Sequence, residues 1–287
     1  MALPVRPPHL LKACQYSIAL KDKTLLMAVV NLTPDSFSQD GRLARRNDPS
    51  ANLRYIQQVI DQGADMIDLG AESSRPGSVS ISVKEELSRL LPTLKKAAKR
   101  IQVPISVDTC KVEVAQAALD AGASIINNIQ GTKLDPALLK MVRDYKAAIV
   151  LMHMRGNPLT MQKKISYKNL LKEVKQELQV SVEKCLEIGI KKDRIILDPG
   201  LGFAKTSEQS IEIIRNLYQL HSLGCPVLLG PSRKSFIGQI IGRPVQDRLL
   251  GTAAAVTLGI AFGAHIVRVH DVKEMKDVVL MSDAIIN

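Results

Sequence analysis

The sequence predicts an α/β protein, a single-domain (β/α)8 barrel of the TIM-barrel class. Eight short apolar runs alternate with eight segments of helical periodicity, and continuous apolar runs are typical of parallel strands buried on both faces. The chain has 287 residues, close to the roughly 250 residues usual for this barrel. No break in composition and no low-complexity linker divides it. We therefore expect residues 25–287 to form the barrel and residues 1–24 to be an N-terminal extension leading into it.

Each element can be placed in order along the chain. The predicted strands are residues 25–30, 65–69, 104–107, 124–127, 148–152, 194–197, 226–230 and 266–269. The predicted helices are residues 52–62, 83–100, 112–121, 136–145, 170–188, 208–220, 247–262 and 272–286. Five glycines follow helical segments and precede strands, as expected at helix ends: Gly63, Gly122, Gly189, Gly224 and Gly263. A doubly wound open sheet is the alternative, but no GxGxxG motif follows the first strand.

Composition limits the possible partners. The formal net charge of +11 is compatible with nucleic acid, a membrane surface or an acidic small substrate. The chain has only four Phe and five Tyr, none of them interleaved with its basic clusters. Proteins that bind single-stranded nucleic acid stack bases on aromatic side chains. We therefore expect small-molecule substrates and no nucleic-acid partner.

The cellular location can also be predicted. The long uncharged stretch at residues 249–267 is rich in Ala and Gly, which favours a buried helix running into a strand over a membrane span. The four cysteines lie far apart without a CxxC pair, as is typical of reduced thiols. The N-terminus has no apolar segment of the kind found in secretory signals. These features predict a cytoplasmic protein with no membrane partner.

Polar side chains gather where the predicted strands end. A (β/α)8 barrel builds its active site from the C-terminal ends of its strands. The residues at or after these ends include Asn31, Arg75, Asp108, Asn127, His153, Asp198, Lys234 and His270. The joins from helix to strand carry mainly Gly and Pro. This asymmetry predicts a functional site at the C-terminal face.

The side chains predict a flat heterocyclic ligand. Asp108, Asn127 and Asp198 end three different strands, and two carboxylates with one amide suit a ring that has amino and ring N–H groups. Lys234 would balance their charge and donate to a ring carbonyl. The alternative is that Asp108 and Asp198 only cap the helices that follow them.

The rim of the predicted site suits a polyanion. Arg75 and Arg268 can bind phosphate oxygens with their guanidinium groups, and Asn31 and His270 lie at neighbouring strand ends. The alternative for His270 is a hydrogen bond to the backbone near a helix N-terminus. No cluster has the spacing of a zinc or iron site. A metal would therefore be Mg²⁺, held mostly by the phosphates of the substrate.

Six motifs occur in order, each after the expected strand: NLTPDSFS, SSRPG, SVDT, DPGLGFAK, SRKSFIG and RVHDV. With them, residues 25–286 resemble the dihydropteroate synthases, folate-pathway enzymes of the pterin-binding barrel family. The resemblance implies condensation of 6-hydroxymethyl-7,8-dihydropterin pyrophosphate with p-aminobenzoate, with release of pyrophosphate. It also implies a homodimer joined through late helices and a p-aminobenzoate pocket that sulfonamides occupy.

The resemblance implies a role for each residue that stands at a matching motif position. The pterin-binding residues would be Asp108, Asn127, Asp198 and Lys234. The pyrophosphate-binding residues would be Asn31, Ser74, Arg75, Arg268 and His270, with Asn31 also a ligand of Mg²⁺. The p-aminobenzoate pocket would be shaped by Phe37, Pro76, Lys234 and Ser235. The catalytic residues would be Asp108, Asp35, Lys234 and Arg268. The chain departs from the common pattern at Ala71, Ser74, Asn128 and Ala204.

Two other functions compete with this reading. A methyltetrahydrofolate:corrinoid methyltransferase shares the barrel and the Asp/Asn set, but it does not need the Phe37 loop or the pair Arg268 and His270. A paralogue that binds pterin without catalysis is the second alternative. The presence of Asp35 and Arg75, together with Lys234 and Arg268, argues against it.

Overall fold

The computed structural model describes residues 3–33, 48–75, 77–163 and 165–286. In these ranges eight parallel strands form one sheet: β3 (Leu25–Asn31), β4 (Met66–Gly70), β5 (Ile105–Asp108), β6 (Ile125–Asn128), β7 (Ala148–Met152), β8 (Ile195–Asp198), β9 (Leu228–Leu229) and β10 (Ile266–Val269). The strands are ordered β8-β7-β6-β5-β4-β3-β10-β9. A parallel bridge between Leu197 and Val227 joins the two ends of this order. The sheet is thus closed, which confirms the predicted barrel and excludes the open sheet.

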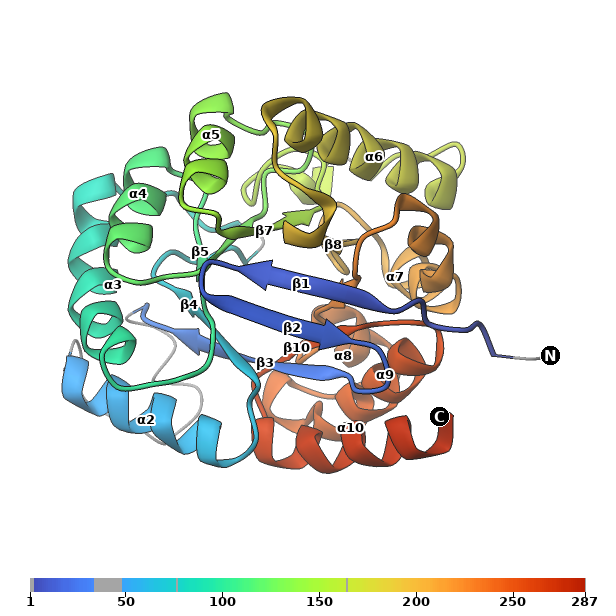
Figure 1. The fold of residues 1–287 in the computed structure, drawn as a ribbon. Helices are drawn as coiled ribbons and strands as arrows, with labels where there is room; N and C mark the ends of the chain where they lie inside the picture. Colours follow the sequence, from blue (N-terminus) through green and yellow to red (C-terminus); the bar gives the residue numbers. More distant parts are fainter. Residues whose placement is uncertain (1–2, 34–47, 76, 164, 287) are drawn as a thin grey trace.

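Helices surround the barrel on its outside (Figure 1). They are α2 (Pro49–Asp61), α3 (Val83–Ala98), α4 (Val112–Asp120), α5 (Pro136–Asp144), α6 (Leu170–Ile188), α7 (Ser207–Arg215), α8 (Ser235–Ile241), α9 (Leu249–Ala261) and α10 (Val272–Ile286). All five glycines predicted at helix ends have φ between +73° and +104°, the left-handed region that glycine enters without a steric penalty. The apolar stretch at 249–267 forms α9 and then β10, as expected. No helix in the described ranges is both long and apolar enough to cross a membrane.

Two helical segments differ from the prediction. The segment predicted at 208–220 divides at Asn216, where α7 gives way to the 3₁₀ helix η3 (Leu217–Leu223). The Asn216 side chain donates to the carbonyl of Glu212 at 2.9 Å, and such local bonds compete with continuation of a helix. The seven-residue helix α8 was not predicted, because it is too short to show helical periodicity.

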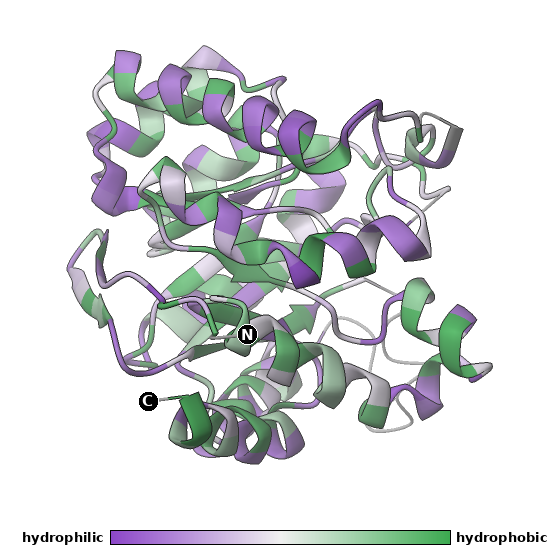
Figure 2. Ribbon diagram, turned by 90° about the vertical axis from the view of Figure 1, so that its right-hand side faces the viewer, coloured by the Kyte–Doolittle hydropathy of each residue, from purple (hydrophilic) through white to green (hydrophobic). Residues whose placement is uncertain are grey.

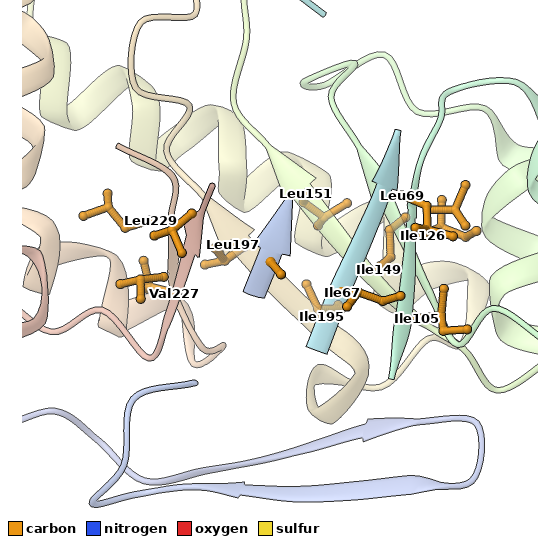
Figure 3. Packing of buried hydrophobic residues seen from close by; sticks show 14 of the residues in the cluster. Ile67, Leu69, Ile105, Ile126, Ile149, Leu151, Ile195, Leu197, Val227 and Leu229 are labelled. Carbon is orange, nitrogen blue, oxygen red and sulfur yellow. The ribbon is translucent and has the colours of Figure 1, made fainter. Parts of the chain in front are cut away.

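The N-terminal extension contains a β-hairpin that the sequence analysis missed. Strand β1 (His9–Ala13) pairs antiparallel with β2 (Tyr16–Leu20). Its Leu11, Ala13 and Leu20 are fully buried and pack with the inward side chains at the N-terminal end of the barrel, such as Met27 and Ile125. The hairpin lies across that end of the strands (Figures 1 and 3). It therefore forms the floor of the barrel.

Alternation along each strand separates two environments. Ile67 and Leu69 of β4 belong to the core between strands and helices, as do Ile195 and Leu197 of β8 (Figure 3). The residues between them point to the barrel interior, because successive side chains of a strand point to opposite faces. Figure 2 shows the result as hydrophobic central strands inside helices of alternating hydropathy. This alternation decides which side chains reach the site.

Candidate active site at the C-terminal ends of the strands

Several polar side chains share the inward parity of their strands, and five of them form the cluster described next. They are Asp68 of β4, Asp108 of β5, Asn127 of β6, Asp198 of β8 and Arg268 of β10. In the sheet, Asp108 is paired with Gly70 on one side and with Asn127 on the other. Each residue lies in the last three positions of its strand. The C-terminal end of the interior is therefore polar, whereas the floor is apolar.

Asp68 is a central residue that the sequence analysis missed. Its carboxylate is fully buried and accepts hydrogen bonds at one oxygen, Oδ2, from Arg268 Nε at 2.8 Å and Asn127 Nδ2 at 3.0 Å. A terminal nitrogen of Arg268, Nη2, lies 3.7 Å from Asp108 Oδ2. The available signal was an acid inside the strand rather than at its start, since the parity of position 68 matches that of the inward residues. Asp68 thus orients two of the predicted site residues.

Of the two predicted carboxylates Asp198 is buried and Asp108 is mostly buried, and neither caps a helix. Burial raises the pKa of Asp108 to about 7, and the neighbouring Asp68 adds to this effect. Burial also raises the pKa of Asp198, although the nearby Lys234 opposes the rise. The helix after β5 has Lys111 at its N-cap, and Asp198 Oδ1 accepts from the amide of Gly200 at 2.7 Å, within its own loop. The capping alternative is therefore wrong for both residues.

Lys234 reaches the same end of the barrel from the β9–α8 connection. Its amine donates to the carbonyl of Leu201 at 2.5 Å and lies 4.4 Å from the centre of the Phe203 ring. Burial lowers the pKa of Lys234 to about 8, while Asp198 acts in the opposite direction. The structure thus brings Lys234 to Asp198, as predicted.

The predicted anion-binding residues lie at or just after the C-terminal ends of β3, β4 and β10. His270 Nδ1 lies 3.0 Å from the hydroxyl oxygen of the buried Ser232. A methyl group at position 70 would lie 3.5 Å from Asn31 Oδ1, which places the Asn31 amide at the rim. Ser74 is half-buried and Arg75 is exposed in the loop after β4.

Four predicted residues remain, three from the expected p-aminobenzoate pocket and one, Asp35, from the expected catalytic set. Ser235 is exposed at the first position of α8. Asp35, Phe37 and Pro76 lie outside the described residues.

Two further charged networks border the site. Lys111 donates to Glu72 Oε2 at 2.7 Å and to Glu86 Oε2 at 2.6 Å. On the other side, the buried Lys205 contacts His153, whose ring also contacts Glu177. The sequence analysis assigned no role to these residues, because their partners come from helices far away in the chain.

The described side chains alone provide few ligands for a metal ion. In the parts of the chain that the structure describes, no group of three His, Cys, Asp or Glu residues could hold one. Asn31 contributes one amide oxygen at the rim. Mg²⁺ usually keeps few protein ligands and takes the rest from substrate phosphates and water. The donor set therefore fits Mg²⁺ that arrives with a polyphosphate substrate.

Comparisons with known proteins agree with this geometry. Residues 27–270 match the family described as "Pterin binding enzyme". A dihydropteroate synthase of Synechocystis sp. is 43% identical over 264 residues, which cover 92% of this chain and 90% of the relative. The crystal structure of Yersinia pestis dihydropteroate synthase with a sulfonamide drug complex has a TM-score of 0.90 and 36% identity, covering 96% of this chain and 98% of that one. A Clostridium difficile dihydropteroate synthase in the presence of pteroic acid has a TM-score of 0.84 and 40% identity, with 92% and 97% covered.

Proposed function

The chain belongs to the family of pterin-binding enzymes and acts as a dihydropteroate synthase of folate biosynthesis, and from this premise we propose how its residues share the reaction. The reaction joins 6-hydroxymethyl-7,8-dihydropterin pyrophosphate to p-aminobenzoate and releases pyrophosphate. One observation carries the proposal: Asp108, Asn127 and Asp198 converge with Lys234 at one end of a barrel whose other end is closed.

The inward-facing polar side chains at the C-terminal ends of the strands bind the pterin. The edge of a pterin carries an amino group and ring N–H groups, which donate, and a carbonyl, which accepts. The buried carboxylate of Asp198 suits the donors, and the amine of Lys234 near it suits the carbonyl. Asp108 and the amide of Asn127 contact the remaining polar edge. Because these groups are already desolvated, they discriminate against ligands that lack matching donors.

Residues at the rim of the site assist the departure of pyrophosphate. Arg268 and His270 face the growing negative charge, with Asn31, Ser74 and Arg75 as further ligands of its oxygens. Arg268 is held by Asp68, so its guanidinium is oriented before the substrate arrives. Asn31 would be the chain's ligand to Mg²⁺, which neutralises pyrophosphate charge when it is bound.

Carbon–nitrogen bond formation follows the loss of pyrophosphate. The exocyclic C–O bond breaks, its electron pair leaves with the pyrophosphate, and the methylene cation is delocalised into the pterin ring. The ionised carboxylate of Asp108 stabilises this cation. The neutral amine of p-aminobenzoate then attacks the methylene carbon and loses a proton. Phe37, Pro76, Lys234 and Ser235 would shape the p-aminobenzoate pocket, and Asp35 would complete the catalytic set with the loop that excludes water.

The outer surface supports the proposed homodimer. Six apolar side chains of α8, α9 and α10 are between 51% and 82% exposed: Ile240, Leu250, Leu258, Leu280, Met281 and Ile285. Apolar side chains concentrated on neighbouring helices mark a contact surface. A second copy of the chain would cover them, and light scattering after gel filtration should give twice the mass of the chain. We expect the dimer to be cytoplasmic.

The test of the proposed function is release of pyrophosphate from the dihydropterin pyrophosphate in the presence of Mg²⁺. We expect release that depends on p-aminobenzoate and is blocked by a sulfonamide. Pterin binding without release would instead indicate the silent paralogue. Methyl transfer to a corrinoid would indicate the methyltransferase.

A further inference from the structure

A buried lysine beside the site has no part in the mechanism above. The side chain of Lys205 is 3% exposed, and its amine lies 2.8 Å from His153 Nδ1 and donates to the carbonyl of Phe203 at 3.0 Å. Burial lowers the pKa of Lys205 to about 7, although the carboxylate of Asp198 opposes the fall. A buried amine is costly unless it is fully hydrogen-bonded. Its contacts therefore indicate a specific task.

The contacts of His153 fix the direction of the hydrogen bonds. Burial lowers the pKa of His153 to about 4, and Lys205 adds to this effect, so the ring is neutral. Its Nε2 lies 3.1 Å from a carboxylate oxygen of Glu177, which only accepts. Nε2 therefore carries the proton, and Nδ1 accepts from the amine of Lys205. Glu177 is in turn paired with Arg155. The chain of hydrogen bonds ties Lys205 to helix α6.

The lysine holds the loop that continues from Asp198. In this loop Gly200 donates its amide to Asp198, Leu201 accepts from Lys234, and Phe203 accepts from Lys205. A methyl group at position 200 would lie only 2.1 Å from the carbonyl oxygen of His153. The loop thus packs closely against the end of β7, and Lys234 and Lys205 each donate a hydrogen bond to one of its carbonyls.

We propose that Lys205 is a positioning residue of the pterin site, which fixes the loop of residues 199–204 and through it the carboxylate of Asp198 and the Phe203 ring. The inference rests on the proposed function, because it takes Asp198 as a pterin ligand. Lys205 itself does not touch the substrate. Its effect reaches the ligand through Asp198 and through the Phe203 ring beneath Lys234.

Because Asp198 is surrounded by charged groups, the proposal can be tested by measuring how pterin binding depends on pH. Burial raises the pKa of Asp198, and the opposing groups are Lys234, the amide of Gly200, Arg268 and Lys205. The charged or titratable groups that face Lys205 are Asp198, Lys234, His153, Glu177 and Arg155. Without the amine at position 205, the pKa of Asp198 rises further. Pterin binding would then be lost at a higher pH as the solution is acidified.

The experiment compares Lys205→Met with a matched control. Methionine keeps the length of the side chain and removes its amine. The control is Lys192→Met, since the Lys192 amine also donates to a loop carbonyl, that of Leu223 at 3.0 Å, but at the other end of β8. Affinity for the dihydropterin pyrophosphate is measured by calorimetry across the acid limb, together with KM for both substrates and kcat.

For Lys205→Met we expect pterin affinity to fall roughly tenfold or more, the loss of one hydrogen bond from a charged group. The acid midpoint of binding should move to higher pH. KM for the pterin substrate should rise far more than kcat falls, while Lys192→Met matches the wild type. Pterin affinity within roughly twofold of the wild type at every pH would overturn the proposal.

A second variant decides the matter if Lys205→Met does not fold. His153→Phe keeps a planar aromatic ring and removes both ring nitrogens, so the amine of Lys205 loses its acceptor. It should shift pterin binding in the same direction, and an unchanged profile would refute the inference. Failure of the proposed function is distinguishable, because it appears in the wild type itself, which then releases no pyrophosphate or binds no pterin.

Discussion

The carboxylate of Asp68 offers a sharp test of how the site is held together. It is fully buried, and one of its oxygens accepts from both Arg268 and Asn127. The other oxygen, Oδ1, has no hydrogen-bond partner in the described structure. Asp68→Asn keeps the shape and one acceptor oxygen but removes the charge, whereas Asp68→Ala removes both. Comparison of the two variants separates the effect of charge from that of the hydrogen bonds.

The magnitudes follow from these contacts. A hydrogen bond to a charged group contributes about 1.5–3 kcal/mol and a neutral one about 0.5–1.5 kcal/mol. Asp68→Asn should therefore lower the free energy of unfolding by about 1–2 kcal/mol. Asp68→Ala leaves Arg268 with Asp108 as its nearest acid, at 3.7 Å. Breaking a buried ion pair in this way costs about 3–5 kcal/mol. Urea denaturation measures both changes.

The same substitution should move the pH dependence of the reaction. Burial and then the charge of Asp68 raise the pKa of Asp108 to about 7. If the ionised carboxylate of Asp108 stabilises the cation, kcat/KM falls as the pH drops through that pKa. Removal of the neighbouring charge in Asp68→Asn lowers the pKa, so the acid limb should shift to lower pH. An unmoved limb, together with equal stability of the two variants, would refute the reasoning.

Three further outcomes are expected. Arg268→Ala should lower kcat by about 10²–10³-fold, as expected for loss of one group that stabilises transition-state charge; steady-state kinetics with unchanged kcat would remove that role. Leu11→Ala in the floor should cost about 2–5 kcal/mol of stability in urea denaturation, with kcat preserved because the site is at the other end. Ala204 has φ of +50°, so Ala204→Gly should gain up to about 1 kcal/mol, and a loss of stability in the same assay would contradict the assigned strain.

Much of the barrel could be predicted because buried parallel strands have a simple signature. Runs such as residues 148–152 are apolar on both faces, and glycines such as Gly63 mark helix ends. The hairpin gave no such signal. Its strands have five residues each and bury mainly Leu11, Ala13 and Leu20. Its partner surface is built from all around the barrel, so the pattern is visible only after the barrel is closed.

The residues of the site also include some that the sequence predicts and some that it does not. Asp108, Asn127, Asp198 and Arg268 could be found because a barrel brings its strand ends together. Asp68 and Lys205 were missed, since their importance comes from burial and from partners distant in the sequence. Asp68 is 200 residues from Arg268 along the chain.

The hairpin floor also determines the path by which ligands enter and leave the enzyme. In the described residues the barrel is closed by apolar side chains at one end, which leaves the end where the strands finish for the passage of ligands. Both substrates enter, and both products depart, by that end. A compound lodged at that end therefore delays the exit of whatever lies deeper. The dwell time of a bound pterin should lengthen when an analogue of p-aminobenzoate occupies the outer pocket.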